Sequence, residues 1–352
     1  MEEKKKTARE IIEGYDGPPV RIMEVCGTHT HEIFRLGIRK LLPEQVELIS
    51  GPGCPVCVTQ VGFIDEAIYL ALERQVTICT FGDLVRVPGT NMSLAGARER
   101  GAKIRIVYSP VDAKEYAKEH PKEQVTFLSV GFETTTPSAC LSVKKAREEG
   151  LTNYSILTAN KTMPQAYEAL KESADIFLYP GHVNAITGTK LCEELAKEGV
   201  SGVVAGFTAK ELLTALAVAL ARFQEGRPFF VNCYPRVVTE NGSPQAQKLV
   251  EEMMEPCDSE WRGLGVIKGS GMRLQEEWSA FDARKKYKMP LIQGKANPAC
   301  RCGDVLQGKC KPSDCKVFGK VCTPQHPIGA CMVSGEGACS AYYMYGEAEK
   351  MK

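Results

Sequence analysis

Short runs of apolar residues alternate with longer amphipathic segments through the first two thirds of the chain. The runs have the length of buried β-strands, and the longer segments repeat apolar residues at helical spacing. The predicted strands are residues 20–25, 46–50, 76–81, 104–108, 125–130, 154–158, 176–179, 202–205 and 229–234. The predicted helices are residues 4–14, 32–42, 62–74, 92–100, 137–149, 209–223 and 244–255. This alternation is typical of an α/β protein with a mainly parallel sheet.

The chain has 352 residues, which exceeds the usual size of a single hydrophobic core. Strands and helices alternate in two consecutive stretches, and the remainder is rich in glycine, proline and cysteine. We therefore predict two successive parallel-sheet α/β domains, residues 1–118 and 119–240, followed by a smaller helical and irregular domain, residues 241–352. An irregular segment with a poor core needs a staple, which metal ligation would provide.

Polar or reactive turns follow several of the predicted strands at their carboxyl ends. The turns are Cys26–His31, Gly51–Cys57, Gly82–Pro88, Gly131–Thr136 and Gly181–His182. Parallel sheets bind ligands at that edge. The pattern predicts a single site in the cleft between the two α/β domains.

Charge and hydropathy exclude several classes of function. Lys plus Arg number 44 against 43 Asp plus Glu, and there is no concentrated basic face of the kind that binds nucleic acid. The longest apolar run, Leu212 to Ala221, is too short to span a bilayer. The N-terminal residues include the cluster 4–6 of three lysines, but no apolar core of a secretory signal follows. We expect a soluble, cytoplasmic protein that binds neither nucleic acid nor membrane.

The cysteine content points to metal or redox chemistry. Fifteen cysteines in a large chain without an export signal are not expected to form structural disulfides. Five scattered cysteines are expected to be small buried apolar residues: Cys79, Cys140, Cys192, Cys233 and Cys257. Seven others crowd the C-terminal part of the chain: Cys300, Cys302, Cys310, Cys315, Cys322, Cys331 and Cys339.

Cys54 and Cys57 form a C-x-x-C pair between the end of a predicted strand and the start of a predicted helix. At that position free N–H groups and the helix dipole favour a thiolate. Such a pair serves thioredoxin-like redox chemistry, zinc sites and iron–sulfur sites. Because no second C-x-x-C exists in the chain, redox or transient metal chemistry is favoured over a structural zinc knuckle.

Cys26 is followed by His29 and His31, so it is a candidate thiolate with imidazole partners or the start of a metal site. The helix N-terminus and the imidazoles would shift Cys26 toward the thiolate. The alternative is a strand-end cysteine beside solvated histidines.

Glu133 and Thr134, with Thr135 and Thr136, place one carboxylate and three hydroxyls at a helix N-terminus. They are a candidate cradle for an anion or a small polar ligand. The alternative is simple capping by Thr136, with Pro137 as the first helical residue. His182 is a lone histidine in a turn, and its use could be structural or catalytic.

Together, the sequences Cys26-Gly-Thr-His-Thr-His, Gly51-Pro-Gly-Cys-Pro-Val-Cys, Gly131-Phe-Glu-Thr-Thr-Thr-Pro and Pro180-Gly-His-Val, with the cysteine-rich tail, resemble the HypD family of hydrogenase maturation factors. The resemblance implies a role in assembling the Fe(CN)2CO moiety of [NiFe]-hydrogenases, with the partner proteins HypC and HypE. It also implies two similar α/β domains and a third domain that carries a cluster.

The composition of the tail alone leaves iron–sulfur ligation and structural zinc open, and it does not select four ligands. The family pattern C-x14-C-x6-C-x16-C falls on Cys300, Cys315, Cys322 and Cys339, which implies a [4Fe–4S] cluster. The resemblance further assigns Cys26 to holding the iron fragment and Cys54 with Cys57 to a redox-active disulfide. Cys302, Cys310 and Cys331 receive no role.

Three hypotheses follow. The first is an assembly scaffold with thiol and iron–sulfur redox chemistry, rather than a conventional turnover enzyme. The second is a hydrolase or transferase with Cys26 as nucleophile, a histidine (His29, His31 or His182) as base, and a structural zinc in the tail. The third is a zinc-stabilised binding module without chemistry.

Overall fold

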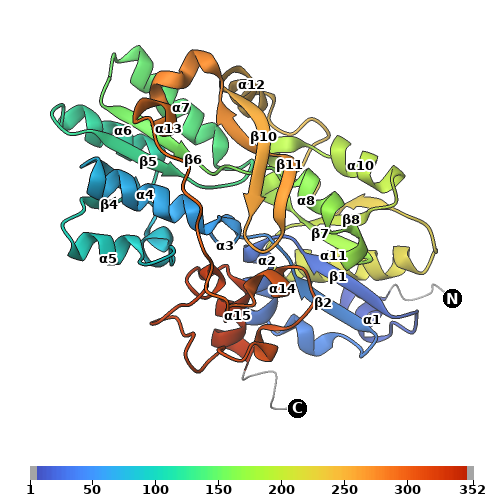
Figure 1. The fold of residues 1–352 in the computed structure, drawn as a ribbon. Helices are drawn as coiled ribbons and strands as arrows, with labels where there is room; N and C mark the ends of the chain where they lie inside the picture. Colours follow the sequence, from blue (N-terminus) through green and yellow to red (C-terminus); the bar gives the residue numbers. More distant parts are fainter. Residues whose placement is uncertain (1–5, 347–352) are drawn as a thin grey trace.

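The computed structural model describes residues 6–346 and contains two parallel sheets (Figure 1). The larger sheet has the strand order β2-β1-β7-β8-β9, and all its neighbouring strands are parallel. Its strands are β1 (Val20–Glu24), β2 (Val46–Ser50), β7 (Ile176–Pro180), β8 (Ser201–Ala205) and β9 (Phe230–Asn232). Ile22 in β1 pairs with Leu48 on one side and with Ile176 on the other.

The smaller sheet has the order β4-β3-β5-β6 and is also parallel throughout. Its strands are β3 (Thr77–Thr80), β4 (Ile104–Ile106), β5 (Val125–Ser129) and β6 (Tyr154–Thr158). All five residues of β5 are buried, as expected for a parallel strand covered on both faces. The predicted α/β class with parallel sheets is therefore confirmed.

The two sheets do not follow one another along the chain as the sequence analysis expects. The larger sheet takes β1 and β2 from the N-terminal segment and β7 to β9 from a later segment, and the whole smaller sheet lies between these two sets. A boundary at residues 118/119 separates β3 from β5, which pair directly. Periodicity identifies strands but carries no information on which sheet edge each strand joins, so this re-entry was not predictable from the pattern.

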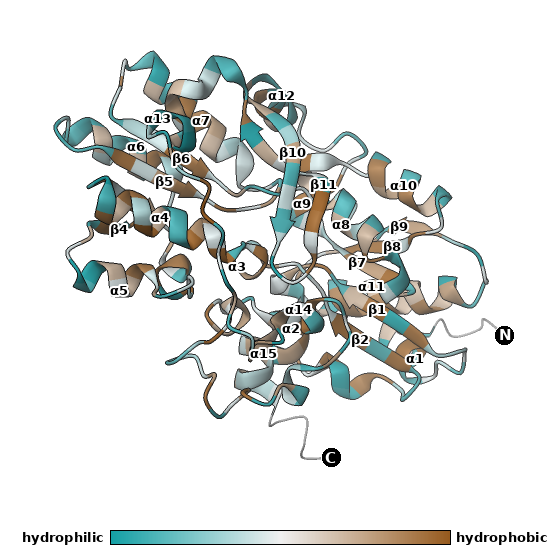
Figure 2. Ribbon diagram, viewed as in Figure 1, coloured by the Kyte–Doolittle hydropathy of each residue, from teal (hydrophilic) through white to brown (hydrophobic). Residues whose placement is uncertain are grey.

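The helices cover the faces of both sheets (Figure 2). They are α1 (Ala8–Glu13), α2 (Gly27–Arg35), α3 (Pro55–Val58), α4 (Val61–Glu73), α5 (Leu94–Glu99), α6 (Pro110–Glu119), α7 (Thr136–Glu148), α8 (Pro164–Ala169), α9 (Gly181–Thr187), α10 (Lys190–Lys197), α11 (Ala209–Phe223), α12 (Pro244–Met253), α13 (Ala283–Lys286), α14 (Cys302–Leu306) and α15 (Ala338–Tyr345). The predicted capping box of Thr208 and Glu211 opens α11. Among the described residues, no helix has both the length and the apolar character needed to cross a membrane.

Two local predictions are wrong at helix starts. The predicted turn Cys26–His31 is helical from Gly27 onward, and α2 ends early because Gly37 adopts a left-handed φ of 66°. The helix α7 starts at Thr136, so Thr135 is its N-cap and Thr136 its first residue. Lys4, where the first predicted helix begins, lies outside the described residues.

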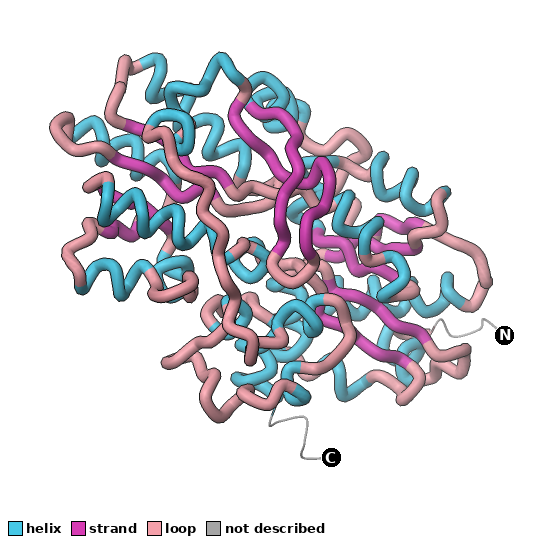
Figure 3. Tube along the Cα trace, in the orientation of Figure 1, coloured by secondary structure: helices cyan, strands magenta, loops and turns pink. Residues whose placement is uncertain are grey.

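The glycine-rich stretch expected to be irregular forms an antiparallel hairpin of β10 (Met254–Trp261) and β11 (Gly265–Leu274). Gly263 and Gly265 adopt positive φ angles of 80° each, which the tight turn requires. The hairpin lies between the two sheets in the view of Figure 3. After α13 the chain is mostly loops and short helices, which agrees with the predicted irregular, cysteine-rich tail.

Candidate functional site

Three of the predicted turns meet at one edge of the larger sheet, because β2, β1 and β7 are neighbours. Gly53 packs directly on the backbone of Cys26: a Cβ added at Gly53 would lie 2.2 Å from the Cα of Cys26. The backbone N–H of Gly27 donates to the carbonyl of Gly53 over 3.2 Å. The structure thus places Cys26 against the loop that carries Cys54 and Cys57.

A buried carboxylate holds this edge together. Glu24, at the end of β1, is fully buried and accepts hydrogen bonds from the hydroxyls of Thr30 at 2.7 Å and Ser50 at 3.1 Å. Arg39 neutralises it through a contact of 2.6 Å. Glu24 therefore joins the start of α2 to the end of β2, and this fixes the position of Cys26 between them.

Cys26 is the N-cap of α2 and only 3% exposed. Burial raises the pKa of its thiol to about 12, and the nearby Glu336 carboxylate adds to the effect, while the backbone N–H of His29 opposes it. The expectation that the helix N-terminus would make Cys26 a thiolate is therefore wrong, because desolvation of the charged sulfur outweighs the amide hydrogen bonds.

The histidine rings do not pair with the Cys26 thiol. The ring of His29 is fully buried and its Nε2 lies 3.0 Å from the carbonyl oxygen of Gly206; burial lowers its pKa to about 4. The rings of His29 and His182 flank Phe207, with centroids 4.8 and 5.1 Å from it. His31 points toward the tail, where Nε2 lies 3.3 Å from the hydroxyl of Tyr345. A thiolate–imidazolium pair of the hydrolase hypothesis is not formed among these residues.

The C-terminal tail covers Cys26. The hydroxyl of Thr28 donates to the carboxylate of Glu336 over 2.7 Å. Gly27 has no room for a side chain, since an added Cβ would lie 2.5 Å from both the Cβ and the carbonyl oxygen of Glu336. Residues separated by more than three hundred positions thus close over the same thiol.

Cys54 and Cys57 lie at the start of α3. The backbone N–H of Cys57 donates to the Sγ of Cys54 over 3.4 Å. Cys57 is fully buried, and its pKa is raised first by burial and then by side-chain hydrogen bonds with Cys331 and Cys54. The pair therefore contacts a cysteine of the tail directly.

The contacts continue from thiol to thiol. Cys331 lies close to both Cys57 and Cys302, and the interaction with these two thiols lowers the pKa of Cys331. Cys302 in turn borders the same hollow as Cys300, whose thiol affects its pKa. We call the five residues that share these contacts the thiol series: Cys54, Cys57, Cys331, Cys302 and Cys300. Sequence reasoning left Cys302 and Cys331 without a role, and only their nearness in sequence to other tail cysteines hinted at one.

The predicted cluster ligands line a common hollow. Cys300, Cys315, Cys322 and Cys339 border it together with Cys302 and Cys331. A set of soft thiolates around an enclosed space fits an iron–sulfur cluster. The hollow measures about 20 Å3, so the cysteines around it would have to move apart to admit a cluster. Within residues 6–346, no three potential ligands stand close enough to share one metal ion. Cys310 borders a different hollow.

Glu133 is a buried titratable group that lacks a hydrogen-bond partner on one of its oxygens. Its Oε1 accepts the backbone N–H of Met163 over 2.8 Å, whereas Oε2 is buried without a partner. Burial raises the pKa of this carboxyl to about 7. The hydroxyl of Tyr167, 3% exposed, is also unpartnered, and the charges of Glu133 and Cys26 both raise its pKa after the larger effect of burial. Tyr167 was not singled out from the sequence.

The hydroxyls near Glu133 serve the backbone rather than a ligand. Those of Thr135 and Thr136 both donate to the carbonyl of Phe132, at 3.2 and 2.9 Å. Thr134 is half-buried. Neither hydroxyl caps α7, which has no side-chain cap hydrogen bond, so the capping interpretation is wrong. Glu133 remains the candidate for ligand chemistry.

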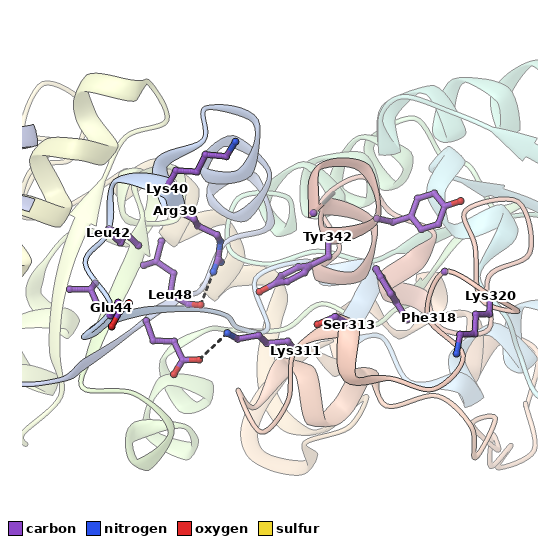
Figure 4. Close-up of a pocket in the computed structure, with 15 residues that line it drawn as sticks. Arg39, Lys40, Leu42, Glu44, Leu48, Lys311, Ser313, Phe318, Lys320 and Tyr342 are labelled. Carbon is purple, nitrogen blue, oxygen red and sulfur yellow. Dashed lines mark hydrogen bonds and ion pairs between the residues drawn. The ribbon is translucent and has the colours of Figure 1, made fainter. Parts of the chain in front are cut away.

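The turn Gly82–Pro88 lies elsewhere: its Arg86 donates to the carbonyl of Pro324 in the tail over 2.8 Å. Another hollow has no cysteine among the described residues that line it (Figure 4). It measures about 970 Å3 and separates β2 from the tail. In its wall Arg39 donates to the carbonyl of Leu48 over 2.8 Å, and Lys311 faces Glu47 at 3.9 Å.

Comparison with known proteins agrees with these motifs. Residues 2–346 match the family model described as "HypD: Hydrogenase formation hypA family". The chain is 44% identical to the hydrogenase maturation factor HypD of Rhizobium leguminosarum over 97% of this chain and 92% of the relative. It is 42% identical to that of Cupriavidus necator (95% and 92% covered) and 43% identical to that of Escherichia coli (94% and 90% covered). The chain belongs to the HypD family of hydrogenase maturation factors.

Proposed function

We propose that this protein is the scaffold on which the Fe(CN)2CO moiety of a [NiFe]-hydrogenase is assembled, with HypC- and HypE-type proteins as partners. The observation that carries the proposal is the thiol series, which runs from Cys54 and Cys57, beside Cys26, to the tail cysteines. A scaffold of this kind needs a sulfur to hold iron and a route for electrons, and the position of Cys26 against the loop of Cys54 and Cys57 supports both roles.

Cys26 is the residue that would hold the iron fragment, which is the cargo of the reaction. A thiolate is a soft donor that suits iron carrying CO and cyanide ligands. Because the pKa of free Cys26 is about 12, the thiol keeps its proton at neutral pH and releases it only when a cation replaces it. Burial also keeps water away from the bound fragment.

The contacts within the thiol series allow a disulfide to move between two pairs. The Cys331 thiolate attacks Cys57 of a Cys54–Cys57 disulfide, which forms a Cys57–Cys331 bond and frees Cys54. Cys302 then attacks Cys331 and frees Cys57, leaving a Cys302–Cys331 disulfide. Each freed sulfur takes the proton that an attacking thiol gives up, so the exchange balances without another oxidant.

Cys300, Cys315, Cys322 and Cys339 are the residues that would hold a [4Fe–4S] cluster. When bound, such a cluster supplies or accepts single electrons. Cys302 borders the same hollow as Cys300, so the thiol series ends at one of these proposed ligands. Electrons could thus pass between the tail cysteines and the Cys54/Cys57 pair by thiol–disulfide exchange.

Anaerobic purification, metal and sulfide analysis and an infrared spectrum test the proposal together. We expect about four iron and four sulfide per chain, without zinc, and CO and CN stretching bands from a retained iron fragment. The variant Cys26→Ala should lose those bands, while Cys233→Ala, on a half-buried cysteine outside the site, should keep them. Unchanged bands in Cys26→Ala, or one zinc per chain in place of iron, would reject the proposal.

A further inference from the structure

The tip of the β10–β11 hairpin touches the helix that carries the Cys54/Cys57 pair. The backbone N–H of Arg262 donates to the carbonyl of Val58, and its Nε donates to the carbonyl of Thr59, both over 2.8 Å. Thr59 also pairs with Trp261 in an antiparallel bridge. Arg262 therefore binds the chain immediately after Cys57 with both its backbone and its side chain.

The same tip touches the helix that begins at Cys302. Gly263 and Gly303 pack backbone to backbone: a Cβ added at Gly263 would lie 2.1 Å from the Cα of Gly303. The side chain of Gln307 donates to the carbonyl of Gly263 over 2.7 Å. The tip thus lies between α3, which contains Cys57, and α14, which begins at Cys302.

The guanidinium of Arg262 has no carboxylate partner among residues 6–346. The residue is only 9% exposed, and its Nη2 is buried without a hydrogen-bond partner. It borders a hollow of about 210 Å3 together with Cys300, Cys302 and Asp304. Asp304 is engaged by Arg301 at 2.9 Å. A buried charge without a counter-charge is costly, so the free side of Arg262 calls for an anionic neighbour.

We propose that Arg262 is the counter-charge of the tail cysteines, a positioning residue whose permanent positive charge favours the electron-rich form of the sulfur centre at Cys300 and Cys302. The guanidinium is held in place by α3 and turned toward α14, so it acts on the sulfurs without binding the cargo. For the cluster, the inference rests on the proposed function; for the thiols, it stands on the structure alone.

The electrostatics of the two cysteines agree with this role. The pKa of Cys300 is raised first by its hydrogen bond with Cys302 and then by burial, and Arg262 acts against both. Arg262 also lowers the pKa of Cys302, after the larger effects of Cys300, Cys331 and burial. Arg262 thus opposes the effect of burial on the pKa of both thiols.

The test uses Arg262→Gln, Arg262→Lys and a matched control, Arg301→Gln. Gln keeps a hydrogen-bond donor for Thr59 without the charge, and Lys keeps the charge without the planar fork. Arg301 lies beside the same cysteines but is exposed and already paired with Asp304. The readout is the midpoint potential of the cluster in anaerobically purified protein, followed by electron paramagnetic resonance.

Arg262→Gln should favour the oxidised form about tenfold, a negative shift of about 59 mV for a one-electron couple. Arg262→Lys and Arg301→Gln should stay near the wild-type potential. A wild-type potential in Arg262→Gln overturns the proposal, and so do equal shifts in the Gln and Lys variants, because they would show a purely structural role.

A second readout does not depend on the cluster. In metal-free protein equilibrated with glutathione buffers, Arg262→Gln should stabilise the Cys302–Cys331 disulfide relative to the dithiol, and Arg262→Lys should not. If the wild-type protein binds no cluster, the proposed function fails while this measurement still decides the role of Arg262. An unchanged equilibrium in Arg262→Gln overturns that role.

Discussion

Cys26 and Cys331 are both buried cysteines, yet their thiols behave in opposite ways. Cys26 is 3% exposed and its pKa is raised to about 12, chiefly by burial. Cys331 is fully buried and its pKa is lowered, because interactions with the neighbouring Cys302 and Cys57 thiols outweigh burial. Burial alone stabilises the neutral thiol, whereas a pair of donors stabilises the thiolate.

The difference separates two roles that the sequence motifs alone do not distinguish. Cys26 is inert until a cation displaces its proton, which suits a residue that holds iron. Cys331 lies among other sulfurs and its pKa is lowered, which suits thiol–disulfide exchange. On the proposed function, the cysteine that would hold the iron fragment and the nucleophile of the thiol series are therefore different residues.

Substitutions at two glycines should disturb the surroundings of Cys26 and of Cys331 separately. A Cβ at Gly53 would lie 2.2 Å from the Cα of Cys26, and one at Gly337 would lie 2.1 Å from the carbonyl oxygen of Cys331. Gly53→Ala and Gly337→Ala should each destabilise the protein by about 3 kcal/mol, since backbone atoms cannot move aside as a flexible side chain does. Urea denaturation measures this directly.

The functional effects of the two variants should differ. Gly53→Ala should weaken retention of the iron fragment, and Gly337→Ala should weaken formation of disulfides at Cys331. Gly96→Ala is the control: it lies in α5, where the nearest atom to an added Cβ is a side-chain atom at 3.4 Å, so it should be neutral or slightly stabilising. Identical effects of Gly53→Ala and Gly337→Ala on both readouts would contradict the separation.

Glu133 should make the stability of the folded protein depend on pH. Its folded-state pKa of about 7 lies above the ordinary value of 4.5, so the native state binds the proton more tightly than the unfolded state does. The resulting stability is fully present below pH 4.5 and is lost as the pH rises through 7.

Glu133→Gln should not lose stability as the pH rises, because glutamine does not titrate. The difference in unfolding free energy between wild type and variant should therefore change by about 2 kcal/mol between about pH 5 and pH 8. Urea midpoints measured at pH 5 and pH 8 for both proteins test it. Glu149→Gln makes a suitable comparison, because its pKa is lowered by Lys114 and Lys118 and its dependence has the opposite sign. A pH-independent difference for Glu133→Gln would show that this carboxyl titrates normally.

The smallest expected effect is that of Glu336 on the pKa of Cys26, because Glu336 is exposed and solvent screens its charge. Its carboxylate contributes to the raised pKa of Cys26, after burial. Glu336→Gln should lower that pKa slightly and so speed alkylation of Cys26 at pH 9, measured by mass spectrometry of the Cys26 peptide. The control is Glu32→Gln. Glu32 lies on α2, the helix that Cys26 caps, but it is paired with Arg35, so this variant should leave the rate unchanged. A slower reaction in Glu336→Gln would contradict the electrostatic explanation.

Sequence reasoning succeeded where a property is local. The strands 46–50 and 154–158 were predicted with the observed bounds, and the cap of Thr208 and Glu211 follows from residues three positions apart. It could not show that the chain returns to the larger sheet at β7, because strand order depends on contacts between distant segments.

The site was predictable to the same degree. Cys26 was placed correctly beside the loop of Cys54, because strand-end turns of neighbouring parallel strands meet at one edge. The direction of the pKa shift of Cys26 was not predictable from the sequence, because the segment that buries it, around Glu336, lies about three hundred residues away along the chain. The contact of Cys57 with Cys331 also joins distant segments and has no signature in spacing.

The central claim is that the thiol series connects the pair beside Cys26 to the tail cysteines through Cys331. Its most direct test is mapping by mass spectrometry of the disulfides that form when metal-free protein is treated with a mild thiol oxidant such as diamide. We predict the bonds Cys54–Cys57, Cys57–Cys331 and Cys302–Cys331, with Cys26 remaining a thiol. Disulfides confined to Cys54–Cys57 with Cys331 unreacted, or a dominant bond to Cys26, would contradict the account.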